Sequence, residues 1–313
     1  MRAIDAEATR RHLPFGALID TLRQRFREGC EVPQRHTHAI GNDGTLLLMP
    51  AWRAGARLGL KTVGIFPGNS LLGLPGLHST YLLFDAHTGV PLALIDGNEI
   101  TARRTAAASA LAASYLARAD ARSLLIVGAG RVASLLAEAM RTVRPIERVQ
   151  VWNHRAAAAE QLAARLRAQG IAAQACTDLQ AAVPEADIVS CATLATTALV
   201  HGAWLRPGTH LDLIGSFTPA MHEADAACFA RSSVFIDTAE ALAKSGDVLQ
   251  AKAAGAFTDE HLCATLAGLC SGAHAGRGSA TECTLFKAVG TALEDLAAAE
   301  LVFDAVVAGE SLC

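Results

Sequence analysis

The chain has no apolar run long enough to cross a membrane, and its first residues do not predict a secretory signal. Although 51% of its 313 residues are hydrophobic, no run approaches the roughly 18 residues that a membrane span needs. Its first residues, MRAIDAEATRRHLPF, lack the basic start and apolar core of a signal peptide. We therefore expect a cytoplasmic protein with no membrane partner.

A strong charge of either sign and closely spaced metal ligands are also missing. The formal net charge is −3, which leaves no basic footprint for nucleic acid. The eight cysteines form no C-x-x-C pair, so we expect reduced thiols and no zinc site. His36 and His38 would face one side of a strand, but no third ligand accompanies them. We interpret both as ordinary strand residues and predict no bound metal.

The chain does contain a short apolar run that turns on glycines into a helix. In SLLIVGAGRVASLLAEA, residues 123–139, Gly128, Gly130 and Ala133 have G-x-G-x-x-A spacing. Gly128 suits the tight turn, Gly130 has no Cβ to hold a pyrophosphate away, and Ala133 allows close helix packing. A glycine turn before any helix gives the same letters, but a second strand follows here at 149–152. The complete unit predicts a dinucleotide site at the helix N-terminus.

The end of that second strand carries no acid. NAD-specific sites commonly place Asp or Glu there for the ribose hydroxyls, whereas a 2′-phosphate needs the acid absent and a cation nearby. This chain has Asn153, His154 and Arg155. We expect NADP(H) as the preferred cofactor and NAD(H) as the alternative. Arg155 could also be a solvated residue at the start of the next helix.

Two regions of the chain differ in their pattern. Before residue 117, a helix over 14–28 precedes strand-like runs separated by turn signals, which indicates a mostly antiparallel α+β unit. An alanine-rich helix over 102–117 then leads to a region where strands alternate with helices, which indicates a parallel sheet covered on both faces. The expected strands span 45–49, 58–66, 80–85 and 92–96 in the first region, and 124–127, 149–152, 188–190, 210–214 and 234–237 in the second.

A final long helix is predicted over 282–307, and we expect it to run back onto the first region. The length of 313 residues is sufficient for two domains. The expected fold class is therefore α/β, with a Rossmann-type parallel-sheet domain over 118–289. A discontinuous α+β domain would combine 1–117 with 290–313.

Several longer runs together resemble one family. They are GTLLLMPAW, GLKTVGIFPGN, YLLFDAHTGVPLALIDGNEITARRTAAASALAASYLA, LLIVGAGRVA, ATLATTALVHGAWLRPGTHLDLIGSFTP, SGDVL and TLFKAVGTALEDLAAA. In this order they resemble the ornithine cyclodeaminase and mu-crystallin family. The resemblance implies a homodimer in which the α+β domain binds substrate and dimerises. It also implies one of several activities, namely ornithine cyclodeamination, alanine dehydrogenation or reduction of cyclic ketimine acids.

The same resemblance implies which cations bind a small amino or imino acid. Arg35, Lys61 and Arg104 match the family's substrate-binding cations, and fixed cations suit a carboxylate in a partly dry pocket. Lys61 stands in an apolar run, which disfavours a solvated lysine, although a surface position is the plain alternative. Arg35 could instead cap a strand edge. Arg103 and Arg104 diverge by about 100° on a helix, so we expect only one to face the site.

The remaining candidates also follow from the resemblance. Lys61 and Arg104 are the catalytic candidates, and Thr80, Phe217 and Val289 would join the cations around the substrate. The cofactor-binding candidates are Thr80, Arg104, Gly128, Gly130, Arg131, Val132, Asn153, His154, Arg155, Thr193, Leu213, Ile214 and Ala288.

One loop departs from the pattern of the cyclodeaminases. Those enzymes carry an aspartate in G-x-D-x-P-G-K, whereas this chain reads GSFTPAM, with Phe217 for the aspartate and Met221 for the lysine. A phenyl ring accepts no proton, so the deaminating chemistry loses its expected base. Phe217 could alternatively pack under the loop, and Asp96, Glu99 or Asp212 could supply another acid.

A reductase needs less from the protein, because the nicotinamide performs the hydride chemistry. The GSFTP loop resembles that of pyrroline-2-carboxylate and piperideine-2-carboxylate reductases. We therefore expect an NAD(P)H-dependent enzyme that reduces Δ1-pyrroline-2-carboxylate, and its six-membered homologue, to L-proline and L-pipecolate. Ornithine cyclodeaminase is the alternative enzyme. A non-catalytic NADP-dependent ligand-binding protein, like mu-crystallin, is the alternative from a different class.

Overall fold

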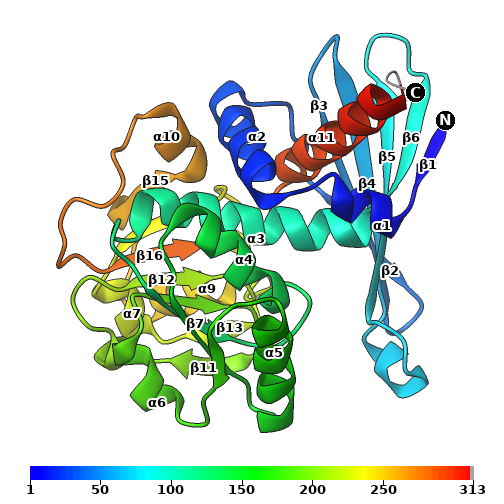
Figure 1. Cartoon of the computed structure of the whole chain (residues 1–313). Helices are drawn as coiled ribbons and strands as arrows, with labels where there is room; N and C mark the ends of the chain where they lie inside the picture. Colours follow the sequence, from blue (N-terminus) through cyan, green and yellow to red (C-terminus); the bar gives the residue numbers. More distant parts are fainter. Residues whose placement is uncertain (311–313) are drawn as a thin grey trace. The chain divides into compact units, whose positions relative to one another are not determined.

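The computed structural model describes residues 1–310. The chain forms two compact units, one made of residues 1–104 together with the chain from Thr291 onward, and one made of residues 105–290 (Figure 1). The division falls inside one helix, earlier than the boundary at 117 expected from the sequence. In the described residues no helix has both the length and the apolar character of a membrane span.

The first unit contains a six-stranded sheet in the order β1-β6-β5-β4-β3-β2. Neighbouring strands are antiparallel except β1 and β6, which are parallel. This agrees with the mostly antiparallel sheet expected from the turn signals. The strands are β1 (Arg2–Ile4), β2 (His36–Ile40), β3 (Gly44–Trp52), β4 (Arg57–Ile65), β5 (Leu77–Asp85) and β6 (Pro91–Asp96).

Two long helices of the first unit pack against each other, and one of them covers the sheet. Helix α2 (Phe15–Glu28) directs Leu18, Ile19 and Leu22 inward, and α11 (Ala292–Glu310) contacts α2, β3 and β4. The carboxylate of Glu300 on α11 pairs with Arg25 at 2.7 Å and with Arg53 at 2.8 Å. The unit also contains α1 (Ala6–Arg11) and the 3₁₀ helix η1 (Pro67–Leu72).

Helix α3 (Gly97–Leu116) begins five residues before the predicted start at 102. The carboxylate of Asp96 accepts a hydrogen bond from the backbone N–H of Glu99 at 2.8 Å, which satisfies a free donor of the first turn. Alanines fill the later turns, and Ala106, Ala110 and Ala113 are completely buried. Such small side chains let other segments approach the helix backbone closely.

The second unit is built on an eight-stranded sheet in the order β15-β14-β16-β12-β10-β7-β8-β9. All neighbouring strands are parallel, and β7, β10 and β12 are buried along their whole length, so both faces are covered. The α/β fold class is thereby confirmed. The strands are β7 (Ser123–Val127), β8 (Arg148–Trp152), β9 (Ala173–Ala175), β10 (Ile188–Cys191), β12 (His210–Leu213), β14 (Ser233–Ile236), β15 (Leu262–Thr265) and β16 (Thr284–Lys287).

The connections of the second unit are helices, 3₁₀ turns and one small parallel pair. The pair is β11 (Thr196–Val200) with β13 (His222–Ala224). The helices are α4 (Ala133–Val143), α5 (Ala156–Ala168), α6 (Leu179–Ala182), α7 (Ala226–Ala230), α8 (Ala241–Lys244), α9 (Gly246–Ala253) and α10 (Leu266–Ser271), and the 3₁₀ turns are η2 (Val183–Glu185), η3 (Gly202–Trp204) and η4 (Asp259–His261).

The long final helix predicted over 282–307 is wrong at its beginning. Residues Thr284–Lys287 form β16, which lies between β12 and β14 in the sheet. The helix begins only at Ala292, after Gly290 takes a φ of +77°. A four-residue strand buried on both faces has no alternation, so its apolar letters cannot be distinguished from those of a helix.

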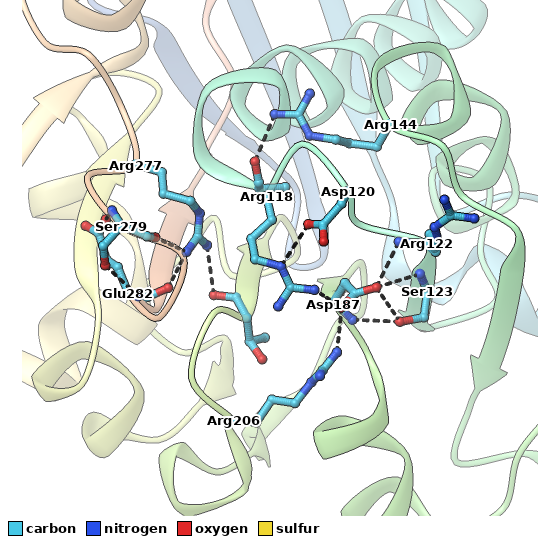
Figure 2. Close-up of polar contacts among 12 residues, drawn as sticks. Arg118, Asp120, Arg122, Ser123, Arg144, Asp187, Arg206, Arg277, Ser279 and Glu282 are labelled. Carbon is cyan, nitrogen blue, oxygen red and sulfur yellow. Dashed lines mark hydrogen bonds and ion pairs between the residues drawn. The ribbon is translucent and has the colours of Figure 1, made fainter.

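A buried aspartate joins the amino ends of two neighbouring strands of the second unit. Asp187, just before β10, accepts hydrogen bonds from the backbone N–H groups of Arg122 at 2.8 Å and Ser123 at 3.0 Å (Figure 2). Arg118 and Arg206 each contact its other oxygen at 2.5 Å. Burial opposes ionisation, but these donors hold the pKa of Asp187 below its usual value. This cluster is structural, because it lies at the sheet edge opposite to the glycine turn.

Two arginines from other segments cap the C-terminus of helix α3. Arg144 donates to the carbonyl oxygens of Ser114 and Ala117 at 2.7 and 2.9 Å, and Arg277 donates to that of Leu116 at 2.6 Å. Figure 2 shows both guanidinium groups beside the Asp187 cluster. Cations at a helix C-terminus satisfy carbonyls that lack helical partners and complement the helix dipole.

Candidate functional site

The glycine turn after β7 has the geometry that its sequence predicts. Gly128 has a φ of +124°, and a Cβ there would lie 2.5 Å from the carbonyl oxygen of Ala192. A Cβ on Gly130, by contrast, would meet no atom within 4 Å. Ala133 is fully buried at the start of α4. The backbone at Gly130 therefore borders open space, which is the condition for close approach of a phosphate.

This turn stands at the point where the strand order of the sheet reverses. From β7 the chain goes outward to β8 and β9 on one side, and then returns to β10 and β12 on the other. In doubly wound sheets the crevice at this point, beyond the carboxyl ends of the strands, binds the ligand. Val132 at the N-cap of α4 has no side-chain acceptor to offer, and Arg131 before it is exposed. The N–H groups of the first turn can therefore face an anion.

The end of β8 is organised by its own asparagine. Asn153 accepts a hydrogen bond from the backbone N–H of Arg155 at 2.9 Å. His154 and Arg155 are exposed, and helix α5 begins at Ala156. The short loop thus presents one imidazole and one guanidinium to solvent and no carboxylate.

The other cofactor candidates of the second unit follow the carboxyl ends of β10, β12 and β16. Thr193 comes after β10, Leu213 ends β12 and Ile214 follows it, while Ala288 follows β16. Leu213, Ile214 and Ala288 are buried, and Thr193 is half-buried. Parallel strands end at one edge of their sheet, so the fold brings these residues to the same edge as the glycine turn.

The substrate candidates Val289 and Phe217 stand on loops at the same edge. The carboxylate of Asp237 accepts from the backbone N–H groups of Val289 at 2.8 Å and Gly290 at 2.6 Å. Ser216 donates to the carbonyl oxygen of Met221 at 2.7 Å, which fastens the GSFTP loop. The next residue, Phe217, is 38% exposed. Phe217 is therefore not buried beneath its loop, as the packing alternative required.

In the first unit, Lys61 lies on the buried face of the sheet. Alternate residues of β4, namely Gly59, Lys61 and Val63, face inward. Lys61 is opposite Tyr81 of β5, and only 2% of its side chain is exposed. A Cβ on Gly59 would lie 1.9 Å from the Tyr81 hydroxyl oxygen, so the ring needs this glycine. The expectation that Lys61 is not a solvated lysine is confirmed.

A carboxylate from α11 joins Lys61 to Arg104. Lys61 Nζ lies 2.6 Å from one oxygen of Asp295, and Arg104 Nε donates to the other at 2.8 Å. Arg104 also contacts Glu294 at 2.5 Å. All four side chains are almost completely buried. We call Lys61, Arg104, Glu294 and Asp295 the unit-1 charge cluster.

Burial and charge act against each other on the protonation of this cluster. Burial lowers the pKa of Lys61 to about 8, and neighbouring Arg104 acts in the same direction, while Asp295 opposes both. Burial disfavours ionised Asp295, but the two cations hold its pKa below the usual value. Near neutral pH the lysine is therefore charged yet close to losing its proton, as suits a residue that binds or transfers one.

Arg103 and Arg104 diverge as predicted. Arg103 donates to the carbonyl oxygen of Leu13 at 2.8 Å and stacks on Phe15, 4.4 Å from the ring centre. Arg103 thus serves packing, and only Arg104 joins Lys61.

Arg35 and Thr80 have less defined positions. Arg35 is half-buried in the segment before β2, and the contacts of Lys61 and Arg104 described above do not include it. Thr80 is exposed on β5, and its hydroxyl lies 2.6 Å from that of Thr62 on the neighbouring strand.

Sequence reasoning missed Glu294 and Asp295. Both stand in ALEDLAAA, where two consecutive acids interrupt an apolar helix. Buried charges need partners, and the same sequence places Lys61 in an apolar strand. The acid pair in an apolar helix and the lysine in an apolar strand were the available signals, but only the fold shows that these charges are one another's partners.

Comparisons with known proteins agree over most of the chain. A model of the ornithine cyclodeaminase/mu-crystallin family matches residues 6–310. A Δ1-pyrroline-2-carboxylate reductase of Paracoccus denitrificans is 42% identical over 286 residues, which are 89% of this chain and 90% of that protein.

Solved structures are similar over nearly their full length. The Δ1-pyrroline-2-carboxylate reductase of Thermococcus litoralis, in complex with NADH and L-proline, has a TM-score of 0.94 and 32% identity, covering 99% of this chain and 98% of that one. An archaeal alanine dehydrogenase, a dimer with bound NAD, has a TM-score of 0.91 and 27% identity, covering 99% and 97%. With the glycine turn and the doubly wound sheet, these matches show that the chain belongs to the ornithine cyclodeaminase/mu-crystallin family.

Proposed function

We propose that this protein reduces the C=N bond of Δ1-pyrroline-2-carboxylate to give L-proline, using a reduced nicotinamide cofactor. The observation that carries the proposal is the full-length likeness to the Thermococcus litoralis reductase, which binds NADH and L-proline. Phe217 favours reduction over cyclodeamination, because this exposed residue supplies no proton acceptor where cyclodeaminases have an aspartate.

The second unit fits the cofactor. The open backbone at Gly130, the positive φ of Gly128 and the first turn of α4 would hold the pyrophosphate. The buried loop residues Ile214 and Ala288 would shield the nicotinamide from water, with Thr193 beside them. When bound, the reduced nicotinamide supplies the hydride for the imine carbon.

The first unit supplies the cations. Lys61 and Arg104 would bind the substrate carboxylate, the guanidinium by its forked donors and the ammonium as a point charge. Their charges are balanced formally by Glu294 and Asp295, and these ion pairs would rearrange when the substrate carboxylate binds. Arg35, in the segment before β2, would be the third cation, as the resemblance to the family implies. Lys61 would also hold a proton at Nζ, where its lowered pKa of about 8 makes release feasible.

We further propose a preference for NADPH over NADH. The loop after β8 presents His154 and Arg155 and no acid, which suits a 2′-phosphate better than free ribose hydroxyls. The six-membered homologue Δ1-piperideine-2-carboxylate would be a second substrate, because it differs by one methylene, which changes hydrophobic binding by only about 1–3 kcal/mol.

We propose a homodimer as the working form. The similar archaeal alanine dehydrogenase is a dimer, and the segment from η1 to β5 exposes apolar side chains that a second copy would cover. Leu71 and Leu72 are 90% and 74% exposed, and Leu74 is 52% exposed.

We propose a reducing compartment such as the cytoplasm for this protein. The seven cysteines of the described residues are free thiols, which suits such a compartment. Cys313 lies outside those residues.

The test uses the purified full-length protein with each candidate substrate. NADPH or NADH with Δ1-pyrroline-2-carboxylate should lose nicotinamide absorbance, and L-proline should accumulate. Ammonia release from L-ornithine with NAD would instead support cyclodeaminase activity. Tight NADPH binding with neither reaction would support a ligand-binding protein.

A further inference from the structure

A single buried carboxylate ties together two loops at the carboxyl edge of the parallel sheet. One oxygen of Glu223, on β13, accepts from the backbone N–H of Thr193 at 2.7 Å and from its hydroxyl at 2.8 Å. The other oxygen accepts from the backbone N–H of Gly215 at 2.7 Å. Glu223 is completely buried. Three donors therefore converge on one group that, when ionised, only accepts hydrogen bonds.

The two loops follow neighbouring strands and touch each other. Thr193 comes after β10 and Gly215 after β12, and these strands pair in parallel. A Cβ on Gly215 would lie 2.0 Å from the carbonyl oxygen of Thr193 and 2.4 Å from Glu223. Residue 192 in turn packs against Gly128 of the phosphate turn. Glu223 thus fixes the backbone immediately beside the dinucleotide crevice.

The backbone that carries Glu223 is itself held by a second buried carboxylate. Asp247 of α9 accepts from the backbone N–H groups of Glu223 at 2.7 Å and Ala224 at 3.0 Å. Lys287, at the end of β16, is also completely buried and lies 3.4 Å from Asp247. Its positive charge lowers the pKa of both Glu223 and Asp247, while burial raises that of Glu223 overall. Glu223 is therefore held by hydrogen bonds both at its backbone and at its carboxylate oxygens.

We propose that Glu223 is a positioning residue that holds the Thr193 and Gly215 loops ready for the nicotinamide half of the cofactor. This inference rests on the proposed function. Glu223 touches neither substrate nor cofactor in this scheme, because it is completely buried and each of its oxygens accepts from one of the two loops. Its effect is on the backbone that borders the cofactor, so that binding does not have to order these loops.

The test is Glu223→Gln, which keeps the shape and removes one acceptor. The amide oxygen of Gln can still accept both donors of Thr193, but its –NH₂ group then faces the N–H of Gly215. We expect hydrogen exchange, followed by mass spectrometry, to accelerate in peptides covering residue 215 and much less in those covering 193. NADPH or NADH should bind about tenfold more weakly, as measured by nicotinamide fluorescence, and kcat should fall about 10- to 100-fold with a smaller change in the imine KM.

The matched control is Asp187→Asn at the opposite edge of the same sheet. Asp187 is also buried and also accepts from backbone N–H groups and a hydroxyl. This variant should lower Tm while leaving cofactor affinity and kcat near their native values. If both variants lose affinity in proportion to lost stability, Glu223 is only structural and the inference is overturned.

A measurement on the native protein covers the case in which Glu223→Gln does not fold. Without cofactor, the amides of residues 193 and 215 should already be protected from exchange, and cofactor should add little. Fast exchange that slows only on cofactor binding would overturn the inference. If the native protein binds neither nicotinamide cofactor, the proposed function itself is contradicted. If the native protein binds a cofactor tightly and Glu223→Gln binds it equally tightly with a native kcat, only the inference about Glu223 is contradicted.

Discussion

The candidate substrate cluster of the first unit and the cofactor loops of the second unit use buried carboxylates differently. In the first unit, Asp295 faces two side-chain cations, Lys61 and Arg104, which hold its pKa low although burial opposes them. In the second unit, Glu223 and Asp237 accept mainly from backbone N–H groups, and burial raises the pKa of each. Side-chain cations can rearrange toward a substrate carboxylate, whereas backbone donors cannot leave their loops. The difference separates a cluster suited to bind charge from one suited to hold shape.

The largest expected effect comes from removing Arg104. Arg104→Ala should lower kcat/KM for the imine by about 10²-fold or more, a cost of about 3 kcal/mol. It should also destabilise the protein by about 3–5 kcal/mol, because Glu294 and Asp295 lose their buried partner. Steady-state kinetics and thermal unfolding measure the two effects.

Arg104→Lys separates the two effects. The lysine keeps the charge for Asp295 but lacks the fork, so stability should largely return while kcat/KM stays low. Native kcat/KM in either variant would show that Arg104 does not bind substrate.

Asp295→Asn tests whether the anion of the first unit sets the protonation of Lys61. Lys61 must carry its proton for carboxylate binding, so kcat/KM should fall as pH rises through about 8 in the native enzyme. Asp295 raises this pKa, and its loss should move the fall to lower pH and reduce kcat/KM about tenfold at pH 8. The measurement is the pH profile of kcat/KM.

Glu300→Gln is the matched control on the same helix. Glu300 also bridges two cations, Arg25 and Arg53, so its loss should lower Tm without moving the pH profile. An identical profile in Asp295→Asn would remove the assigned role of the Lys61–Asp295 pair.

A new charge on the second unit should have a moderate effect. Phe217→Asp should weaken imine reduction about tenfold, since a carboxylate close to the substrate carboxylate adds repulsion in a low-dielectric site. It should not create a cyclodeaminase, because Met221 still replaces the family lysine. Phe217→Leu, which adds no charge, should retain most activity. Unchanged kcat/KM in the aspartate variant would place Phe217 away from the substrate.

The smallest effect is expected at the surface of the second unit. Arg155→Ala should narrow the preference for NADPH over NADH by a few-fold and spare NADH, because exposed ion pairs contribute little. Arg148→Ala, at the start of β8 and so at the opposite end of this strand from the loop that carries Arg155, should leave kcat/KM for both cofactors unchanged. Equal kcat/KM for the two cofactors in the native enzyme would remove the proposed preference.

Local features of the site were predictable from the sequence. The different duties of Gly128 and Gly130 depend on backbone conformation within one turn, and the structure shows a positive φ at one and open space at the other. The burial of Lys61 followed from its apolar neighbours. The divergence of Arg103 and Arg104 followed from helix geometry.

Features that depend on distant residues were not predictable. The sequence pattern predicts helix where the structure has β16, because a short strand buried on both faces carries no periodicity. The sequence assigns no role to Asp295 or Glu223, because an acid in an apolar segment does not indicate which residue it will contact. Asp295 meets Lys61 from the opposite end of the chain, and Glu223 meets Thr193 and Gly215 through a small strand pair that no pattern indicated.

The alternating second unit, the phosphate turn and the membership of the family can all be inferred from the residues, because they depend on local conformation and on the order of motifs. The pairing of the buried charges, and the loops that are fixed before a ligand arrives, became visible only in the folded chain. The physical reason is that a buried ion pair or a shared carboxylate depends on the distance between side chains in space. Sequence separation does not encode that distance.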